Sequence, residues 1–187
     1  MGKISKGLAY IQSIPFYLKI AAFIVLLIAL GTLGTFLDKI VFGTYGKKER
    51  LEFSMFVIVV SWLLVILMAV LFVSGLHEKI SVINWPLTAA INMAIWALLL
   101  FISACLIADT ARQYDKSVTG GISLCDFLDN VDHDAKCGHL IAASIMCFIA
   151  TIIFGVDAFL NIKIWRGAEP SSSTAAAPPA PANVQSS

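Results

Sequence analysis

Charged side chains are scarce in this sequence. Only 13% of its 187 residues are Asp, Glu, Lys or Arg, whereas 59% are hydrophobic, and the formal net charge is +1. A soluble domain of this size would need a more polar surface to remain in water. The small net charge also argues against nucleic acid as a partner. The composition therefore predicts an integral membrane protein.

Short motifs of catalytic and metal centres are missing as well. The chain has no C-x-x-C, no H-E-x-x-H and no Ser/His pair within a hydrophobic run. Such motifs are the usual signs of redox, metal-assisted or nucleophilic catalysis. We therefore expect a protein that is not an enzyme, with no catalytic residue, cofactor or metal.

Long hydrophobic runs are what the sequence does have. A bilayer core about 30 Å thick needs roughly 20 apolar residues at about 1.5 Å per residue. The sequence predicts an all-α, four-transmembrane-helix bundle over 16–166, flanked by a segment 1–15 and a disordered Pro/Ala/Ser tail 167–187. The lysines near the start, Lys19 among them, are expected to meet lipid headgroups. The expected spans are 16–37, 53–73, 87–108 and 140–164.

The fourth run contains an acid, Asp157. A carboxylate at the centre of a membrane helix costs about 2.5–3.5 kcal/mol on insertion scales. Steps of three and four residues put Asp157 on a small and polar face, opposite a face of large aliphatic residues. Asp157 is therefore predicted to point into the bundle, as a satisfied structural acid or, alternatively, as an ion or proton site. The small and polar face consists of Ala143, Cys147, Ala150, Phe154, Asp157 and Asn161.

Asn92 is the partner that the sequence suggests for Asp157. The third and fourth spans run in opposite directions, so the two polar groups should lie at about the same depth. A hydrogen bond between Asn92 and Asp157 would fix the register of the two spans, at about 0.6–2 kcal/mol.

Small residues predict where helices approach closely. Gly31 and Thr35 are four residues apart in the first span, with Gly34 beside them. Such a small-xxx-small pair lets a neighbouring backbone approach, and Ala143 and Ala150 should do the same in the fourth span.

Cys125 and Cys137 are the two cysteines in an aqueous segment, the loop between the third and fourth spans. They could close a disulfide loop worth about 3 kcal/mol. A metal site with His133 and His139 is the alternative, although no standard zinc spacing fits. Lysines and arginines are too evenly distributed to decide the orientation, whereas a disulfide would place this loop outside and both termini in the cytoplasm.

The fourth run also resembles a known family. The stretch 149–159, IATIIFGVDAF, followed by Lys163 and Trp165-Arg166, is similar to the fourth helix of MARVEL-domain proteins, in particular the chemokine-like-factor, plasmolipin and MAL branches. The plan of four spans, a tight second turn and a cysteine-bearing last loop is similar too. The resemblance implies cytoplasmic termini and a role without catalysis in vesicle trafficking, membrane apposition or junctions.

Two functions follow from these patterns. The first is a protein of the plasma membrane or of vesicles that organises membrane domains, trafficking or cell junctions by lateral association with lipids, with other membrane proteins or with itself. The alternative is a small channel or transporter subunit that uses Asp157 and Asn92 as an ion or proton site. One acid and one amide are few for a conduction path, and no pair of spans is visibly broken as in transporters.

Overall fold

A computed structural model describes residues 14–39, 48–74, 84–116, 118–119, 122–123, 125 and 137–167. Its helices are α2 (Ile14–Lys39), α3 (Lys48–Val73), α5 (Trp85–Lys116) and α7 (Cys137–Gly167). By length and composition all four can cross a membrane. The predicted four-span, all-α fold is therefore confirmed. The expected N-terminal segment and C-terminal tail lie almost entirely outside the described residues.

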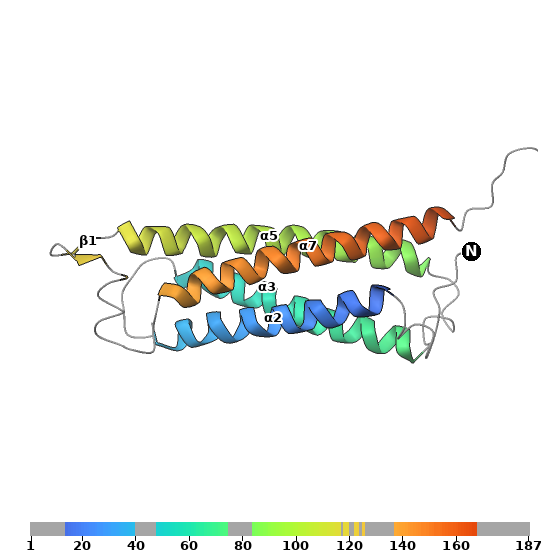
Figure 1. Ribbon diagram of the computed structural model, residues 1–187, viewed down its shortest axis with the longest axis horizontal. Coiled ribbons are helices and arrows are strands. Elements are labelled where there is room, and N and C mark those ends of the chain that lie inside the picture. The colour runs from blue at the N-terminus through green and yellow to red at the C-terminus, as the bar shows by residue number, and fades with distance from the viewer. Residues whose placement is uncertain are drawn as a thin grey trace, which may run out of the picture.

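The four helices form an elongated bundle in which successive helices run in opposite directions (Figure 1). Helix α7 packs against α2 and α5, and α3 packs against the same two helices. The start of α2 and the end of α7 lie at one end of the bundle, and α5 extends beyond its neighbours at the other end (Figure 1). Residues from the first turns of α2 can therefore meet residues from the last third of α7 across the α2–α7 interface.

Hydroxyl side chains inside the helices bond to the backbone of their own helix. Thr110 Oγ1 donates to Leu106 O at 2.8 Å, and Thr151 Oγ1 donates to Cys147 O at 2.9 Å. In lipid, where water cannot compete, a polar group without such a partner would cost several kcal/mol. These threonines therefore sit in apolar helices without opening them.

The α5–α7 interface is lined by small side chains. Four buried alanines recur in α5 at seven-residue intervals, which puts them along one stripe of the helix. Ser144 of α7 donates a buried hydrogen bond of 3.0 Å to the backbone oxygen of Ala104, one of the four. Ala143 and Ala150 of α7 are also fully buried. Small residues let the two backbones approach closely, which is how helices associate in lipid. The α5 stripe is Ala90, Ala97, Ala104 and Ala111.

Two short paired strands follow α5, and this pair was not predicted from the sequence. Strands β1 (Val118–Thr119) and β2 (Ile122–Ser123) pair antiparallel, and Gly120-Gly121 separates them in the sequence. Two glycines between short strands are a known signal for a tight hairpin turn. At two residues each, the strands are too short to show an alternating pattern of their own.

The disulfide expected between Cys125 and Cys137 is confirmed, with Cα atoms 5.6 Å apart. Cys137 is the first residue of α7, so the bond attaches the preceding loop to that helix. The alternative metal site is excluded in this oxidised state, because disulfide sulfurs are not thiolate ligands. His133, its third predicted ligand, lies outside the described residues.

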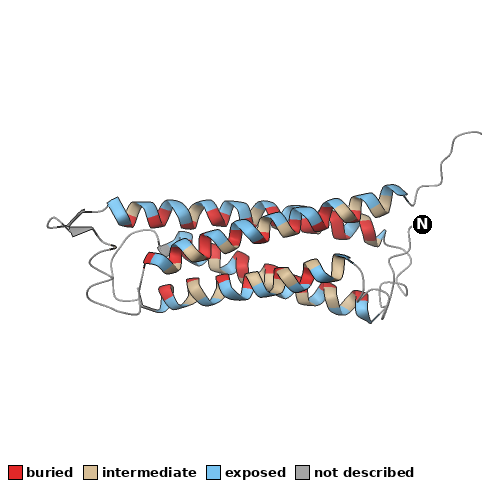
Figure 2. Cartoon of the chain, viewed as in Figure 1, coloured by how far each residue is buried: buried red, intermediate tan, exposed pale blue. Residues whose placement is uncertain are grey.

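The outer surface of the bundle is largely aliphatic. Figure 2 shows exposed residues alternating with buried ones along every helix. On α7 the exposed residues include Ile145, Ile149, Ile152 and Val156, the face that the sequence assigned to lipid. Such membrane-embedded helices contact lipid acyl chains along this surface.

Candidate functional site

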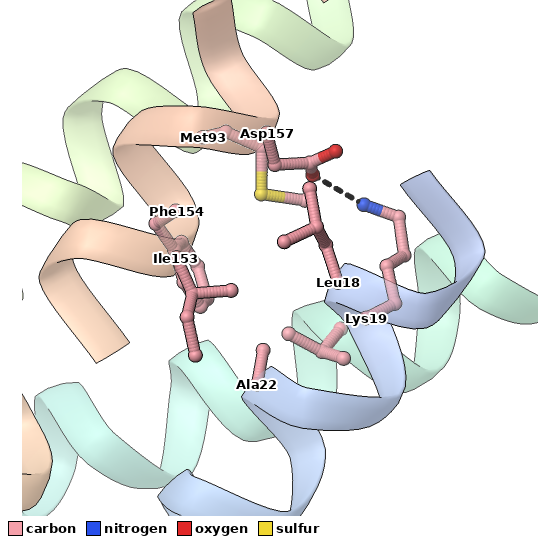
Figure 3. A pocket seen from close by; sticks show the side chains of 8 residues that line it. Leu18, Lys19, Ala22, Met93, Ile153, Phe154 and Asp157 are labelled. Carbon is pink, nitrogen blue, oxygen red and sulfur yellow. Dashed lines mark hydrogen bonds and ion pairs between the residues drawn. The ribbon is translucent and has the colours of Figure 1, made fainter. Parts of the chain in front are cut away.

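A buried ion pair joins the first and last helices of the bundle. Lys19 Nζ of α2 lies 2.6 Å from Asp157 Oδ2 of α7, and each side chain is only 4% exposed. The two residues are 138 positions apart in the sequence. Figure 3 shows the Lys19 side chain reaching across the interface to the carboxylate.

The faces of both helices explain why the two charges meet. On α7, Asp157 belongs to the small and polar face, and all six of its residues are buried. On α2, Lys19 begins a stripe of buried residues at steps of three and four, which is the spacing of one helix face. That stripe is Lys19, Ala22, Leu26, Ala29, Leu33 and Phe36.

Asn161 gives the carboxylate a second partner. One turn after Asp157, its Nδ2 donates to Asp157 O at 2.8 Å and lies 3.3 Å from Asp157 Oδ1. Each carboxylate oxygen therefore has a polar partner, one charged and one neutral. A buried charge needs such partners because removing it from water costs several kcal/mol.

A small cavity borders the ion pair and receives side chains from all four helices. Its lining includes Ala22 of α2, Met93 of α5 and Phe154 of α7 (Figure 3). Val65 of α3 lines it as well. About 10 Å³ is open to the centre of a water molecule, which is the room that one water needs. An organic substrate or a hydrated ion does not fit in this space.

A second ion pair, at the opposite end of the bundle, differs in its exposure. Arg50 of α3 donates to Asp109 Oδ2 of α5 at 3.0 Å, and Gln113 donates to the same oxygen at 2.6 Å. The Arg50 and Asp109 side chains are 43% and 47% exposed. Pairs in water typically contribute 0–1 kcal/mol, so the buried pair is the stronger candidate for a structural or functional role.

The predicted pairing of Asn92 with Asp157 is wrong. Asp157 bonds to Lys19 and Asn161, whereas the buried Nδ2 of Asn92 has no hydrogen-bond partner among the described residues. The predicted depth was sound, because Met93, the next residue, lines the cavity beside Asp157. Depth alone did not place the amide on the right face of α5.

Lys19 lies in the bundle interior and not among the lipid headgroups, where its position near the start of the span had predicted it. The helical stripe that begins at Lys19 was the signal that could have found it. Proximity to the start of the span favoured the surface, but a lysine stem is long enough to reach inward along a helix as well as outward.

The small-residue pair Gly31 and Thr35 does not pack helices within this bundle. Both residues are exposed, and a Cβ added at Gly31 would have no neighbour within 4 Å among the described residues. Gly34 instead lies on the α3 side, where an added Cβ would be 3.4 Å from Met55 Cε. The motif predicted a helix contact in this segment of α2. Of its two glycines, Gly34 is the one that faces another described helix.

No site for a metal ion is found in the described part of the chain, where His, Cys, Asp and Glu side chains do not gather in groups of three. The site is thus an ion pair closed off by apolar side chains, beside a cavity for at most one water. This arrangement can hold two helices together.

Comparison with known proteins agrees with the tetraspan architecture. The family model MARVEL, a membrane-associating domain, matches residues 10–160. The chain belongs to the MARVEL family. The match includes Lys19 and Asp157, so both members of the ion pair lie within the MARVEL domain.

Two plasmolipins are among the similar proteins. Plasmolipin of Bos taurus is 28% identical over 120 residues, and plasmolipin of Mus musculus is 26% identical over 120 residues. Each match covers 64% of this chain and 58% of the relative, so it spans little more than half of the relatives' length. No solved structure matches the chain significantly.

Proposed function

We propose that this MARVEL protein is a non-enzymatic organiser of membrane domains that acts by lateral association with lipids and other membrane proteins. The observation that carries the proposal is the paired, buried acid beside a cavity too small for a substrate. The buried acid in the described bundle is neutralised by Lys19, and the cavity beside it holds at most one water. Within the described part of the chain, the aliphatic outer surface of the bundle is the part that is open to interaction.

The same observation argues against the channel or transporter reading. That reading needed an acid and an amide that face a common path, and Asn92 is not bonded to Asp157. A cation would have to displace the Lys19 ammonium before it could bind the carboxylate. Broken helices, which line the substrate sites of many transporters, are not found in the four described spans.

The role in trafficking or junctions is inferred from the family. A protein with four apolar spans and a lipid-facing surface fits a plasma-membrane or vesicle location. We propose lipids, other membrane proteins or a second copy of the chain as its lateral partners.

Reconstitution of the full chain tests the proposal. Fluorescently labelled protein in giant vesicles with coexisting lipid phases should concentrate in one phase or form clusters. The same protein in sealed liposomes should leave proton and cation flux at the level of empty liposomes. Uniform distribution together with flux that Asp157→Asn abolishes would favour the transporter.

We also propose that both termini face the cytoplasm. The support is the disulfide between Cys125 and Cys137, which lies at the bundle end opposite the start of α2 (Figure 1). Disulfides persist in lumenal and extracellular compartments and are rare in the cytosol. A C-terminal tag should be protected from protease in intact cells and become accessible after selective permeabilisation. Cleavage of the tag in intact cells would show that the C-terminus is extracellular and would contradict the proposed orientation.

A further inference from the structure

Helix α2 is buried unevenly along its length. From Leu26 onward, four apolar residues are completely buried: Leu26, Ala29, Leu33 and Phe36. In the described residues up to Phe23, Ala22 is the one apolar side chain in the buried core, while Ile14 and Tyr17 are 68% and 62% exposed. Phe16 and Phe23 are only partly buried, and Phe23 stacks on Trp62 of α3 rather than on α7. Apolar packing thus anchors the far part of α2 more firmly than its start.

The ion pair lies in this weakly packed part of α2. Lys19 and Ala22 are the first buried residues of α2, and both line the cavity with Asp157 (Figure 3). In lipid no hydrophobic force presses helices together, so small contacts and polar bonds decide whether they dock. At the start of α2 the contact with Asp157 is the strong polar bond that the structure shows.

Helix α7 has a different kind of contact on its other side. Against α5 the hydroxyl of Ser144 donates a hydrogen bond to the backbone oxygen of Ala104, and neither group carries a charge. Removing the charge of Lys19 or Asp157 should therefore leave the α5–α7 interface intact. The two faces of α7 are held by separable interactions.

We propose that the Lys19–Asp157 pair is a latch that holds the first half of α2 against α7, and that loss of the pair opens this end of the bundle sideways towards the bilayer. The second half of α2 remains docked and acts as the hinge. Opening exposes the cavity lining, including Leu18, Ala22 and Ile153, to lipid acyl chains. This inference does not depend on the proposed organising function.

Distances between spin labels on the full chain test the latch. One label pair replaces Tyr17 and Phe159, which are 62% and 60% exposed and lie two residues from Lys19 and Asp157 respectively. A control pair replaces Gly31 and Ile145. Each lies twelve residues from its member of the ion pair, Lys19 or Asp157, towards the other end of the bundle, which is about 18 Å along the helix. Both control positions are exposed, so neither label disturbs the core.

The label background needs two further changes. The free cysteines Cys105 and Cys147 are replaced by alanine, while the disulfide is retained because its sulfurs do not react with the label. Distances are measured in lipid nanodiscs for the wild-type pair, for Lys19→Met, and for the reversed pair Lys19→Asp/Asp157→Lys. Methionine keeps most of the lysine stem, so the single change removes the charge rather than the packing.

The latch predicts a selective change. Lys19→Met should lengthen the 17–159 distance by at least about 5 Å, roughly half the 8–10 Å spacing of packed helices. The 31–145 distance should not change, and the reversed pair should restore the 17–159 distance. An unchanged 17–159 distance in Lys19→Met would overturn the latch. Equal lengthening of both distances, or no recovery in the reversed pair, would overturn it too.

Discussion

The ion pair predicts that its two single substitutions differ in cost. Lys19→Met leaves Asp157 buried and unpaired, and removing one partner of a buried pair typically costs about 3–5 kcal/mol. Asp157→Leu leaves Lys19 without its partner. Lys19 lies five residues after Ile14, the first residue of α2, so it is about 7.5 Å from that end of the helix. Its long stem can carry the ammonium to the headgroups, as membrane lysines do.

The Asp157 carboxylate cannot reach the headgroups in this way. It lies ten residues before Gly167, about 15 Å from the helix end, and its side chain is short. We therefore expect Lys19→Met to lower the free energy of unfolding by about 3–5 kcal/mol and Asp157→Leu to lower it by less. The double variant Lys19→Met/Asp157→Leu should recover most of the loss, because apolar residues often replace a buried pair without cost.

Equilibrium unfolding in mixed micelles with increasing SDS measures these differences. In a background where the other three tryptophans are replaced by phenylalanine, fluorescence of Trp62 reports on α2–α3 contact, because Trp62 stacks on Phe23 of α2 at 5.4 Å between ring centroids. Lys163→Met, at an exposed lysine of α7, is the matched control and should have no effect. Equal costs for the two single variants would refute the argument that only the lysine can reach the headgroups, and two single variants as stable as the control would refute the burial of the pair.

Three further predictions follow from the packing. Ala150→Leu should destabilise the bundle by about 1–3 kcal/mol through overpacking, whereas Ile152→Leu, at a 66% exposed position, should be neutral in the same unfolding assay. Cys125→Ser should abolish the mobility difference between reduced and non-reduced gels and cost about 3 kcal/mol; unchanged mobility would mean that the disulfide does not form. Asn92→Leu should leave stability the same or higher, since the buried amide nitrogen has no partner among the described residues, and a loss above about 1 kcal/mol would indicate a hydrogen bond.

The sequence predicted the number of spans from apolar length and the buried face of α7 from periodicity. Apolar length fixes a membrane span, and steps of three and four residues put Asp157 with Ala150 and Asn161 on one side. The cysteine pair was predictable for a different reason, since two cysteines in one aqueous loop have few alternatives. These features depend on local pattern alone.

The partner of Asp157 was not predictable from depth, because depth leaves the rotation of each helix open. Asn92 and Lys19 both lie near the level of the acid, but only Lys19 begins a continuous buried stripe on its helix. The same ambiguity applies to Gly31 and Gly34, which differ by three residues and face different surroundings. Which glycine meets a neighbouring helix depends on the arrangement of all four helices.

A distance measurement in bilayers tests the central claim most directly. Solid-state NMR of full-length protein, with ¹⁵N in lysine and ¹³C in aspartate side chains, measures the dipolar coupling between Lys19 Nζ and the Asp157 carboxylate. A strong coupling that Lys19→Met removes, consistent with the 2.6 Å contact, is the predicted result. The absence of that coupling, with Lys19 Nζ in contact with lipid phosphate instead, would contradict a bundle held at this end by its buried ion pair.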